Sequence, residues 1–237
     1  MGRRSWGCWA RRLGWWSEED AYLDGHGNLV LRTREVPLEE FRRKCSQDAR
    51  NPWGAKYWDN EYVSGAIRSR GRFERAFGYF EARVAFPYDA TSPGHWPAFW
   101  LYNDTVNRVD HSGRDGTEID IFEYWKTDYV SHALHWDGYG DAHQEALRKM
   151  HVPGLSTGYH VFGLLWTPEM YVFYIDGKET WRSVQGGVAQ TPLYIKLTEE
   201  IDAFYGLVSE ADLPHHTLVD YVRVYETPPM LDRRQVR

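Results

Sequence analysis

Three carboxylates fall within six residues of one strand-like segment, Glu118-Ile-Asp-Ile-Phe-Glu123. Paired carboxylates hydrolyse glycosidic bonds when one acts as a general acid and the other as a nucleophile or base. No Lys or Arg occurs between Arg114 and Lys126, whereas an ordinary surface strand would mix basic residues with the acidic ones. Neighbouring carboxylates raise each other's pKa, so this segment could keep one carboxyl group protonated. The alternative is a solvated acidic strand face, which could bind a cation.

A regular strand cannot place all three acids together. Alternation would put Glu118, Asp120 and Phe122 on one face and would turn Glu123 into the core. A buried, unpaired carboxylate is unfavourable, and Phe122 would bury no apolar surface beside two acids. One extra residue, a β-bulge near Ile121 or Phe122, returns Glu123 to the face of the other acids and turns Phe122 inward. The two Glu Cα atoms would then lie roughly 13 Å apart, which does not decide between retaining and inverting geometry.

Aromatic residues supply candidates for sugar binding. The chain has 12 Trp, 16 Tyr and 10 Phe, and flat apolar rings suit the faces of sugars. Trp96 and Trp100 are four residues apart on one strand face, so we predict that both stack on sugar rings while Phe99 packs in the core. We predict that His135 hydrogen-bonds the acid/base carboxyl group or a sugar hydroxyl. The remaining predicted substrate-binding residues are Trp125, for which core or rim packing is an equal alternative, and Trp136.

The possible metal ligands form no familiar pattern. The chain has two cysteines, Cys8 and Cys45, which excludes a Cys₄ zinc site. The spacing of His132, His135 and His143 matches no zinc motif. We therefore predict no metal ligands and no required cofactor, and the sequence does not indicate a structural Ca²⁺ although one is compatible with it.

Short strand-like runs must position these residues. They are rich in β-branched and aromatic residues, are separated by Gly, Pro and Asp, and show no sustained helical periodicity. This pattern predicts one antiparallel, all-β sandwich and argues against a TIM barrel or a Rossmann sheet. Asp176-Gly177 predicts a hairpin turn, and residues 38–45 predict a short helix. The predicted strands lie at the end of the segment 26–33 and at residues 62–69, 77–86, 97–102, 118–125, 130–136, 159–166, 170–175, 193–197 and 219–225.

Length and net charge limit the possible number of domains and the possible kinds of partner. A chain of 237 residues suits one β-sandwich domain, residues 1–237. The chain has 28 Lys and Arg against 34 Asp and Glu, a net charge of −6 that argues against a nucleic-acid partner. No apolar run is long enough to span a membrane, and the basic, Trp-rich start (residues 1–16) lacks the apolar region of a signal peptide. We predict a charged, frayed tail at residues 228–237 and a monomeric protein.

Several motifs together resemble glycoside hydrolase family 16, the group of laminarinases, lichenases, agarases and carrageenases. The resemblance implies a β-jelly roll with a concave substrate cleft. It also implies that Glu118 is the nucleophile, Asp120 its hydrogen-bonding partner and Glu123 the acid/base, with retention of anomeric configuration. The form with the extra residue, Phe122, resembles laminarinases and galactan-cleaving members, whereas typical lichenases lack it. The motifs are YVSGAI (62–67), FGYFEAR (77–83), WPAFW (96–100), EIDIFE (118–123), LHW (134–136), FYIDG (173–177) and VDYVRVY (219–225).

These features predict an endo-acting hydrolase of a β-1,3- or mixed β-1,3/1,4-glucan that is secreted or periplasmic. Hydrolysis of agar- or carrageenan-type galactans, transglycosylation and non-catalytic glycan binding stay open as alternatives. The sequence departs from the family pattern at two places. No aromatic–acid–aromatic strand precedes Trp15, and Thr198-Glu199-Glu200 replaces an Asn- and Gly-rich turn, so we expect Glu199 and Glu200 at the cleft rim or on the surface.

Overall fold

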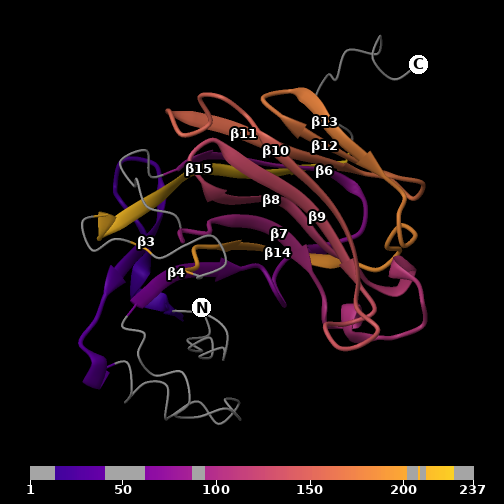
Figure 1. The fold of residues 1–237 in the computed structure, drawn as a ribbon. Helices are drawn as coiled ribbons and strands as arrows, with labels where there is room; N and C mark the ends of the chain where they lie inside the picture. Colours follow the sequence, from indigo (N-terminus) through magenta and orange to yellow (C-terminus); the bar gives the residue numbers. More distant parts are fainter. Residues whose placement is uncertain (1–13, 41–61, 87–93, 202–207, 209–211, 227–237) are drawn as a thin grey trace.

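The computed structural model describes residues 14–40, 62–86, 94–201, 208 and 212–226, which form mainly β-strands and turns. The strands join in one hydrogen-bonded path with the order β10-β9-β8-β7-β14-β4-β3-β15-β6-β11-β12-β13, and β1, β2 and β5 pair with β4, β3 and β14 (Figure 1). The strands are β1 (Gly14–Ser17), β2 (Ala21–Leu23), β3 (Leu29–Glu35), β4 (Tyr62–Arg68), β5 (Glu74–Arg75), β6 (Gly78–Ala85), β7 (Ala98–Tyr102), β8 (Glu118–Lys126), β9 (Tyr129–Trp136), β10 (Gln144–His151), β11 (Tyr159–Trp166), β12 (Tyr171–Ile175), β13 (Lys178–Ser183), β14 (Leu193–Thr198) and β15 (His215–Tyr225); short 3₁₀ helices cover Glu18–Asp20, Asp104–Asn107 and Gly113–Asp115.

The path folds over itself into two layers. By strand pairing, β4, β14, β7, β8, β9 and β10 follow one another in one layer, here called the lower layer, and β3, β15, β6, β11, β12 and β13 follow one another in the other, the upper layer. Figure 1 shows β7 and β14 below β15 and β6. Strand β4 pairs with β14 and also with β3, so it links the two layers. The pairings between the described strands are antiparallel except for β1 with β4. This confirms the predicted antiparallel, all-β sandwich.

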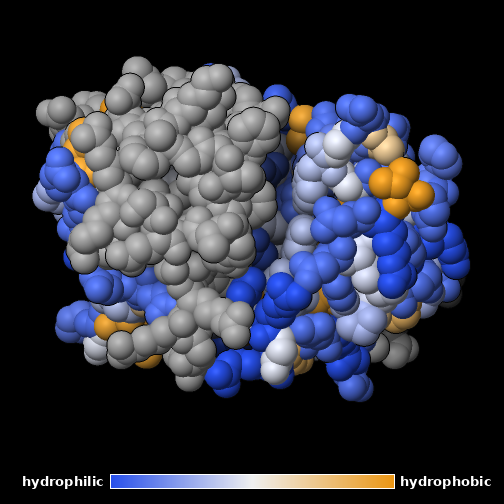
Figure 2. Space-filling model, turned by 90° about the horizontal axis from the view of Figure 1, so that it is seen from below, coloured by the Kyte–Doolittle hydropathy of each residue, from blue (hydrophilic) through white to orange (hydrophobic). Residues whose placement is uncertain are grey.

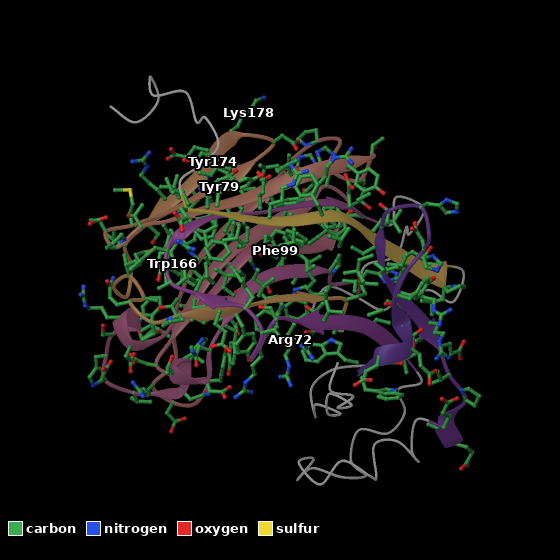
Figure 3. The ribbon with its side chains drawn as sticks, turned by 180° about the vertical axis from the view of Figure 1, so that it is seen from behind. Arg72, Tyr79, Phe99, Trp166, Tyr174 and Lys178 are labelled. Carbon is green, nitrogen blue, oxygen red and sulfur yellow. The ribbon has the colours of Figure 1, made fainter. Side chains whose placement is uncertain are left out.

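A hydrophobic core fills the space between the layers. Phe99 and Phe122 come from the lower layer and meet Phe162 from the upper layer, and all three side chains are buried. The rings of Phe122 and Phe162 lie 4.3 Å apart, centroid to centroid. Figure 3 shows Phe99 and Trp166 between the layers, whereas Lys178 projects outward. Burying each large apolar side chain stabilises the fold by roughly 1.5–3 kcal/mol, so the core holds the two layers together.

Most sequence-predicted elements are confirmed. The strand predicted at 159–166 coincides with β11, and several others differ from the observed bounds by one or two residues. Asp176 and Gly177 have φ values of 50° and 74°, and positive φ at both positions is typical of the type I′ hairpin turn between β12 and β13. Residues 38–40 are helical, and 41–45 lie outside the described residues, as do 1–13 and the predicted tail at 228–237.

Strand β10 was not predicted, because its sequence does not alternate between apolar and polar residues. Its eight residues, QEALRKMH, include one buried side chain, Ala146. It pairs with β9 at the end of the path, where both of its faces can carry polar groups. Among the described residues no helix is long and apolar enough to cross a membrane.

Candidate active site

The three predicted catalytic acids lie on the outer face of the lower layer, on β8 between β7 and β9. On β8, the side chains of Ile119, Ile121, Phe122 and Tyr124 belong to the core, so Glu118, Asp120 and Glu123 point to the opposite face. Figure 2 shows the molecule from below, where most of the coloured residues are hydrophilic. The structure thus brings the three carboxylates together on one face, as predicted.

A β-bulge produces this arrangement. On the β7 side, Phe99 is opposite Phe122 and Trp100 is opposite Asp120, so Ile121 has no counterpart. On the β9 side, the register also shifts between Asp120 and Glu123. Ile121 and Phe122 are both essentially inaccessible to solvent. The extra residue therefore lets Glu123 share a face with Asp120 while two consecutive apolar residues enter the core.

Two donors hold the Glu123 carboxyl group. The Trp96 indole Nε1 donates to Glu123 Oε1 at 3.0 Å, and the Ser131 hydroxyl donates to Oε2 at 3.3 Å. Burial and the negative charge of Asp120 raise the pKa of Glu123 well above its usual value. A carboxyl group with a raised pKa can remain protonated near neutral pH and can therefore act as a general acid.

The Glu118 carboxylate has a different partner. The Tyr139 hydroxyl donates a hydrogen bond to Glu118 Oε2. Burial and the charge of Asp120 raise the pKa of Glu118, while His135 and Lys196 act in the opposite direction. Sequence reasoning missed Tyr139, because it lies in the connection between β9 and β10 rather than on a strand.

Asp120 lies between the two Glu residues and is paired with a histidine. His135 Nε2 is 3.3 Å from Asp120 Oδ2, and His135 Nδ1 is 3.0 Å from His143 Nε2. Burial lowers the pKa of His135, but the contact with Asp120 and its charge outweigh burial and raise this pKa to about 9. The imidazolium therefore offsets one of the three negative charges. His135 faces Asp120 and His143, and its predicted hydrogen bond to the acid/base carboxyl group or to a sugar hydroxyl stays a prediction.

Trp96 and Trp100 both lie at the site, half-buried. The Trp100 indole Nε1 donates to Thr198 Oγ1 at 3.0 Å. The Lys196 ammonium lies 3.3 Å from the centre of the Trp100 ring, a cation–π contact that covers one ring face. A sugar ring could therefore stack only on the other face of Trp100. Lys196 is itself buried, and burial lowers its pKa although Glu118 and Glu200 attract the charge.

The two remaining predicted substrate-binding residues have different positions. Trp125 is half-buried on β8, with its ring centre 5.2 Å from that of Tyr129. Trp136 belongs to the hydrophobic core, and a methyl group added to Gly186 would lie 2.5 Å from its ring. Trp136 therefore packs on the core side of β9, and its predicted role in substrate binding stays a prediction. Adjacent strand residues face opposite ways, so Trp136 points inward because His135 points outward.

Glu199 and Glu200 are buried rather than at a rim or on the surface, so that expectation was also wrong. The chain turns inward directly after β14, and the backbones of Trp96 and Glu200 are joined by two hydrogen bonds. Two groups of possible metal ligands overlap the acidic face, namely Glu118, Asp120 and His135, and His135, His143 and Glu145. A third group involves Glu199 and lies beneath this segment.

The fold and the acidic face together define a class of carbohydrate-active β-sandwich, and comparison with known proteins identifies the family. The chain belongs to family 16 of the glycosyl hydrolases, whose family model matches residues 16–200. A keratan-sulfate endo-1,4-beta-galactosidase from Sphingobacterium multivorum is 29% identical over 70% of this chain and 41% of that protein. A beta-glucanase from Rhodothermus marinus is 27% identical over 90% of this chain and 76% of that protein. The chain therefore spans less than half the length of the former relative.

Solved structures show the same fold. A family 16 enzyme from Bacteroides ovatus, in complex with a mixed-linkage glucan product, has a TM-score of 0.69 at 21% identity, covering 93% of this chain and 92% of that chain. An endo-beta-1,3-glucanase from Pyrococcus furiosus has a TM-score of 0.66 at 25% identity, covering 90% of this chain and 80% of that chain. These similarities confirm the predicted family and jelly-roll sandwich.

Proposed function

We propose that this domain cleaves internal β-linkages of a polysaccharide by double displacement with retention of anomeric configuration. One observation carries the proposal: the bulge in β8 sets Glu118 and Glu123 on one face, with Asp120 between them. Each Glu has its own hydrogen-bond donors, which suits two carboxyl groups with different roles. A domain that only binds glycans would need no such array of buried acids.

In the first step, a Glu118 oxygen attacks the anomeric carbon and forms a glycosyl ester. The bond from that carbon to the leaving oxygen breaks, and the proton of the Glu123 carboxyl group passes to the leaving oxygen. In the second step, the Glu123 carboxylate takes a proton from water while the water oxygen attacks the same carbon. The ester bond breaks, Glu118 leaves as a carboxylate, and Glu123 is protonated again.

Asp120 and His135 adjust the charge between the two Glu residues. The negative Asp120 raises the pKa of Glu123, which keeps the acid protonated before the first step. Protonated His135, whose Nε2 lies 3.3 Å from Asp120 Oδ2, offsets part of the negative charge between the two Glu residues. In this role both residues are positioning residues for the two that react.

We propose a β-1,3- or mixed β-1,3/1,4-glucan as the substrate. Similar curated proteins include enzymes named as a beta-glucanase and as a glucan endo-1,3-beta-glucosidase. The domain needs no cofactor in this reaction, and we expect it to work as a monomer without nucleic-acid or membrane partners. Because the proposed substrate is a glucan polymer too large to enter a cell intact and the chain belongs to glycosyl hydrolase family 16, we expect a secreted or periplasmic protein.

Release of reducing ends from a panel of polysaccharides tests this proposal. Laminarin and barley β-glucan should yield oligosaccharides, whereas Glu118→Gln should yield none. Proton NMR of early products should show the β-anomer before mutarotation, as retention requires. Early α-anomer would rule out double displacement. Binding to a glycan in the panel without release of reducing ends would indicate a non-catalytic module. Products longer than the starting glycan would indicate transglycosylation.

A second candidate substrate is an anionic galactan, because a cation lies in the site. Lys196 is in register with Trp100 on one side and with Arg68 on the other. Similar curated proteins include the keratan-sulfate galactosidase and a kappa-carrageenase. If sulfate groups bind Lys196, Lys196→Met should lower the ratio of activity on carrageenan or keratan sulfate to activity on laminarin at least tenfold. Lys178→Met, in the other layer, is the matched control. Equal losses on both substrates would exclude this role of Lys196.

A further inference from the structure

A second cluster of ligating side chains lies beneath the acidic face. It contains His95, Glu199 and His215, whose ligand atoms all lie within 4.8 Å of one another. The three residues come from distant segments. His95 precedes Trp96, Glu199 follows β14 in the lower layer, and His215 begins β15 in the upper layer. The cluster therefore lies where the two layers meet, and its members are far apart in the sequence.

The polar atoms of this cluster are buried and poorly satisfied. His95, Glu199 and His215 are 4%, 0% and 2% exposed. Within the described part of the chain, neither nitrogen of either imidazole has a hydrogen-bond partner, and Glu199 Oε1 has none. The other carboxylate oxygen, Oε2, accepts a hydrogen bond from Thr217 at 2.7 Å. Leaving so many buried polar atoms unpaired costs roughly 1–3 kcal/mol each, which is a heavy penalty for one small volume.

An ion pair alone does not explain the arrangement. His215 Nε2 lies 3.5 Å from Glu199 Oε1, without hydrogen-bond geometry. The rings of His95 and His215 meet edge to face, with centroids 3.5 Å apart, so two basic groups are held against each other. The geometry thus places one carboxylate oxygen and two imidazoles around a buried point without hydrogen bonds between them.

We propose that His95, Glu199 and His215 bind a divalent transition-metal ion, for which Zn²⁺ is the best fit. Two neutral imidazoles and one carboxylate are a common protein donor set for Zn²⁺, whereas Ca²⁺ and Mg²⁺ require mainly oxygen ligands. The ion would satisfy one nitrogen of each histidine and the free oxygen of Glu199. Its charge would also stabilise Glu199 as a carboxylate.

This ion would have a positioning role, because the cluster connects directly to the acidic face. His95 adjoins Trp96, whose indole donates to Glu123, and the backbone of Trp96 is bonded to that of Glu200. A metal ion bound to His95 and Glu199 would therefore hold in place the two backbone segments that the hydrogen bonds between Trp96 and Glu200 join. Fixing His215 as well would join the upper layer to the lower one. The inference concerns binding and does not depend on the proposed reaction.

The test uses the full chain, stripped with a chelator and then titrated with ZnCl₂. We expect about one Zn²⁺ per chain after gel filtration and a rise of several degrees in the midpoint of thermal unfolding. Millimolar CaCl₂ should not reproduce that rise. His95→Gln and His215→Gln should each weaken Zn²⁺ binding at least tenfold. Co²⁺ in place of Zn²⁺ should give visible absorption that these variants lose.

His143→Gln is the matched control, because His143 belongs to the more exposed cluster with His135 and Glu145. It should leave Zn²⁺ binding unchanged. If wild-type protein takes up no Zn²⁺ and shows no thermal shift, the proposal is wrong. If His143→Gln abolishes binding, the exposed cluster is the metal site and the proposal is also wrong. If the buried variants fail to fold, Zn²⁺ uptake by wild-type protein that persists in His143→Gln, together with the thermal shift, still supports the buried site.

Discussion

The hydrogen bonds to Glu123 distinguish its two oxygens. An indole N–H can donate but cannot accept, so Oε1, which receives the Trp96 hydrogen bond, cannot carry the carboxyl proton toward that ring. The Ser131 hydroxyl, which donates to Oε2 here, can either donate or accept, so Oε2 can hold the carboxyl proton without losing this contact. This arrangement orients the acid for proton transfer, whereas Glu118 meets a single tyrosine hydroxyl.

Replacing Glu118 with Gln should preserve the fold and remove turnover. The amide is nearly isosteric with the carboxylate but cannot form the glycosyl ester. We expect a loss of more than about a hundredfold in kcat, with circular dichroism unchanged. Wild-type protein in the same buffer is the reference. A folded variant that retains more than about one hundredth of the wild-type rate would exclude Glu118 as the nucleophile.

The pH dependence of kcat/KM should be bell-shaped, with ionised Glu118 and protonated Glu123 in the active form. Burial and the Asp120 charge raise the pKa of Glu123 above the usual value of 4.5, so the alkaline limb should lie in the neutral range rather than near that value. Rates on laminarin across the acid-to-alkaline range measure this. If the residual activity of Glu123→Gln keeps the same alkaline limb, that limb belongs to another group.

Glu123→Gln should also change stability with pH. A carboxyl group whose folded-state pKa is raised contributes stability below its unfolded-state pKa and loses it as pH rises through the folded-state pKa. The wild type should therefore lose stability from about pH 4.5 upward relative to the variant. We expect Glu123→Gln to unfold a few degrees higher than wild type at pH 8 and to lose this advantage at pH 4. Thermal melts of both proteins at pH 8 and pH 4 test this prediction. An equal difference in unfolding temperature at the two pH values would show that the pKa of Glu123 is not raised in the folded state.

At the scale of the element, the bulge in β8 determines which acids meet. Deleting Phe122 leaves Glu-Ile-Asp-Ile-Glu, in which simple alternation still puts the three acids on one face. We expect this deletion to be tolerated better than most strand deletions and to retain activity, at a cost of about 3 kcal/mol for the lost apolar side chain. Inserting Ala between Asp120 and Ile121 should turn Glu123 to the core face and abolish activity.

Turnover and circular dichroism of both variants measure this effect. An insertion variant that is folded and fully active would show that activity does not depend on the face of β8 on which Glu123 lies. So would a folded deletion variant without any activity.

Local sequence predicts the elements whose two faces differ. Strand β8 and its bulge follow from the conflict between Phe122 and Glu123, and β11 follows from an apolar run. Strand β10 could not be predicted, since its two faces are nearly equally polar. The position of Trp136 could have been predicted by extending the alternation rule from His135 by one residue.

Contacts between distant segments lie beyond this reasoning. The hydrogen bond from Tyr139 to Glu118 depends on the path of a loop. The burial of Glu199 depends on β15, which begins 16 residues further along the chain and supplies Thr217. No spacing rule relates such residues, because their separation in sequence is set by intervening loops rather than by a repeat.

At the scale of the whole molecule, both layers share one core, so they should unfold together. Phe99 has no solvent exposure and comes from the strand next to β8. Phe99→Ala should destabilise the protein by about 3–5 kcal/mol while leaving the acidic residues unchanged. Urea unfolding followed by tryptophan fluorescence and by far-UV circular dichroism should show one shared, lowered midpoint. Separate midpoints for the two signals would show that the layers unfold independently.

Among the strands that the structure describes, the hydrogen-bonded path of the sheet has two ends, β10 and β13, which do not pair with each other. Open edges invite strands from other molecules, which is how many β-proteins begin to form fibres. Both edges here are crowded with charge: β10 carries Glu145, Arg148 and Lys149, and β13 carries Lys178 and an ion pair between Glu179 and Arg182. A strand docking on either edge would have to strip water from these groups. Charged side chains therefore oppose polymerisation at the edge strands β10 and β13, where backbone N–H and C=O groups could pair with another strand.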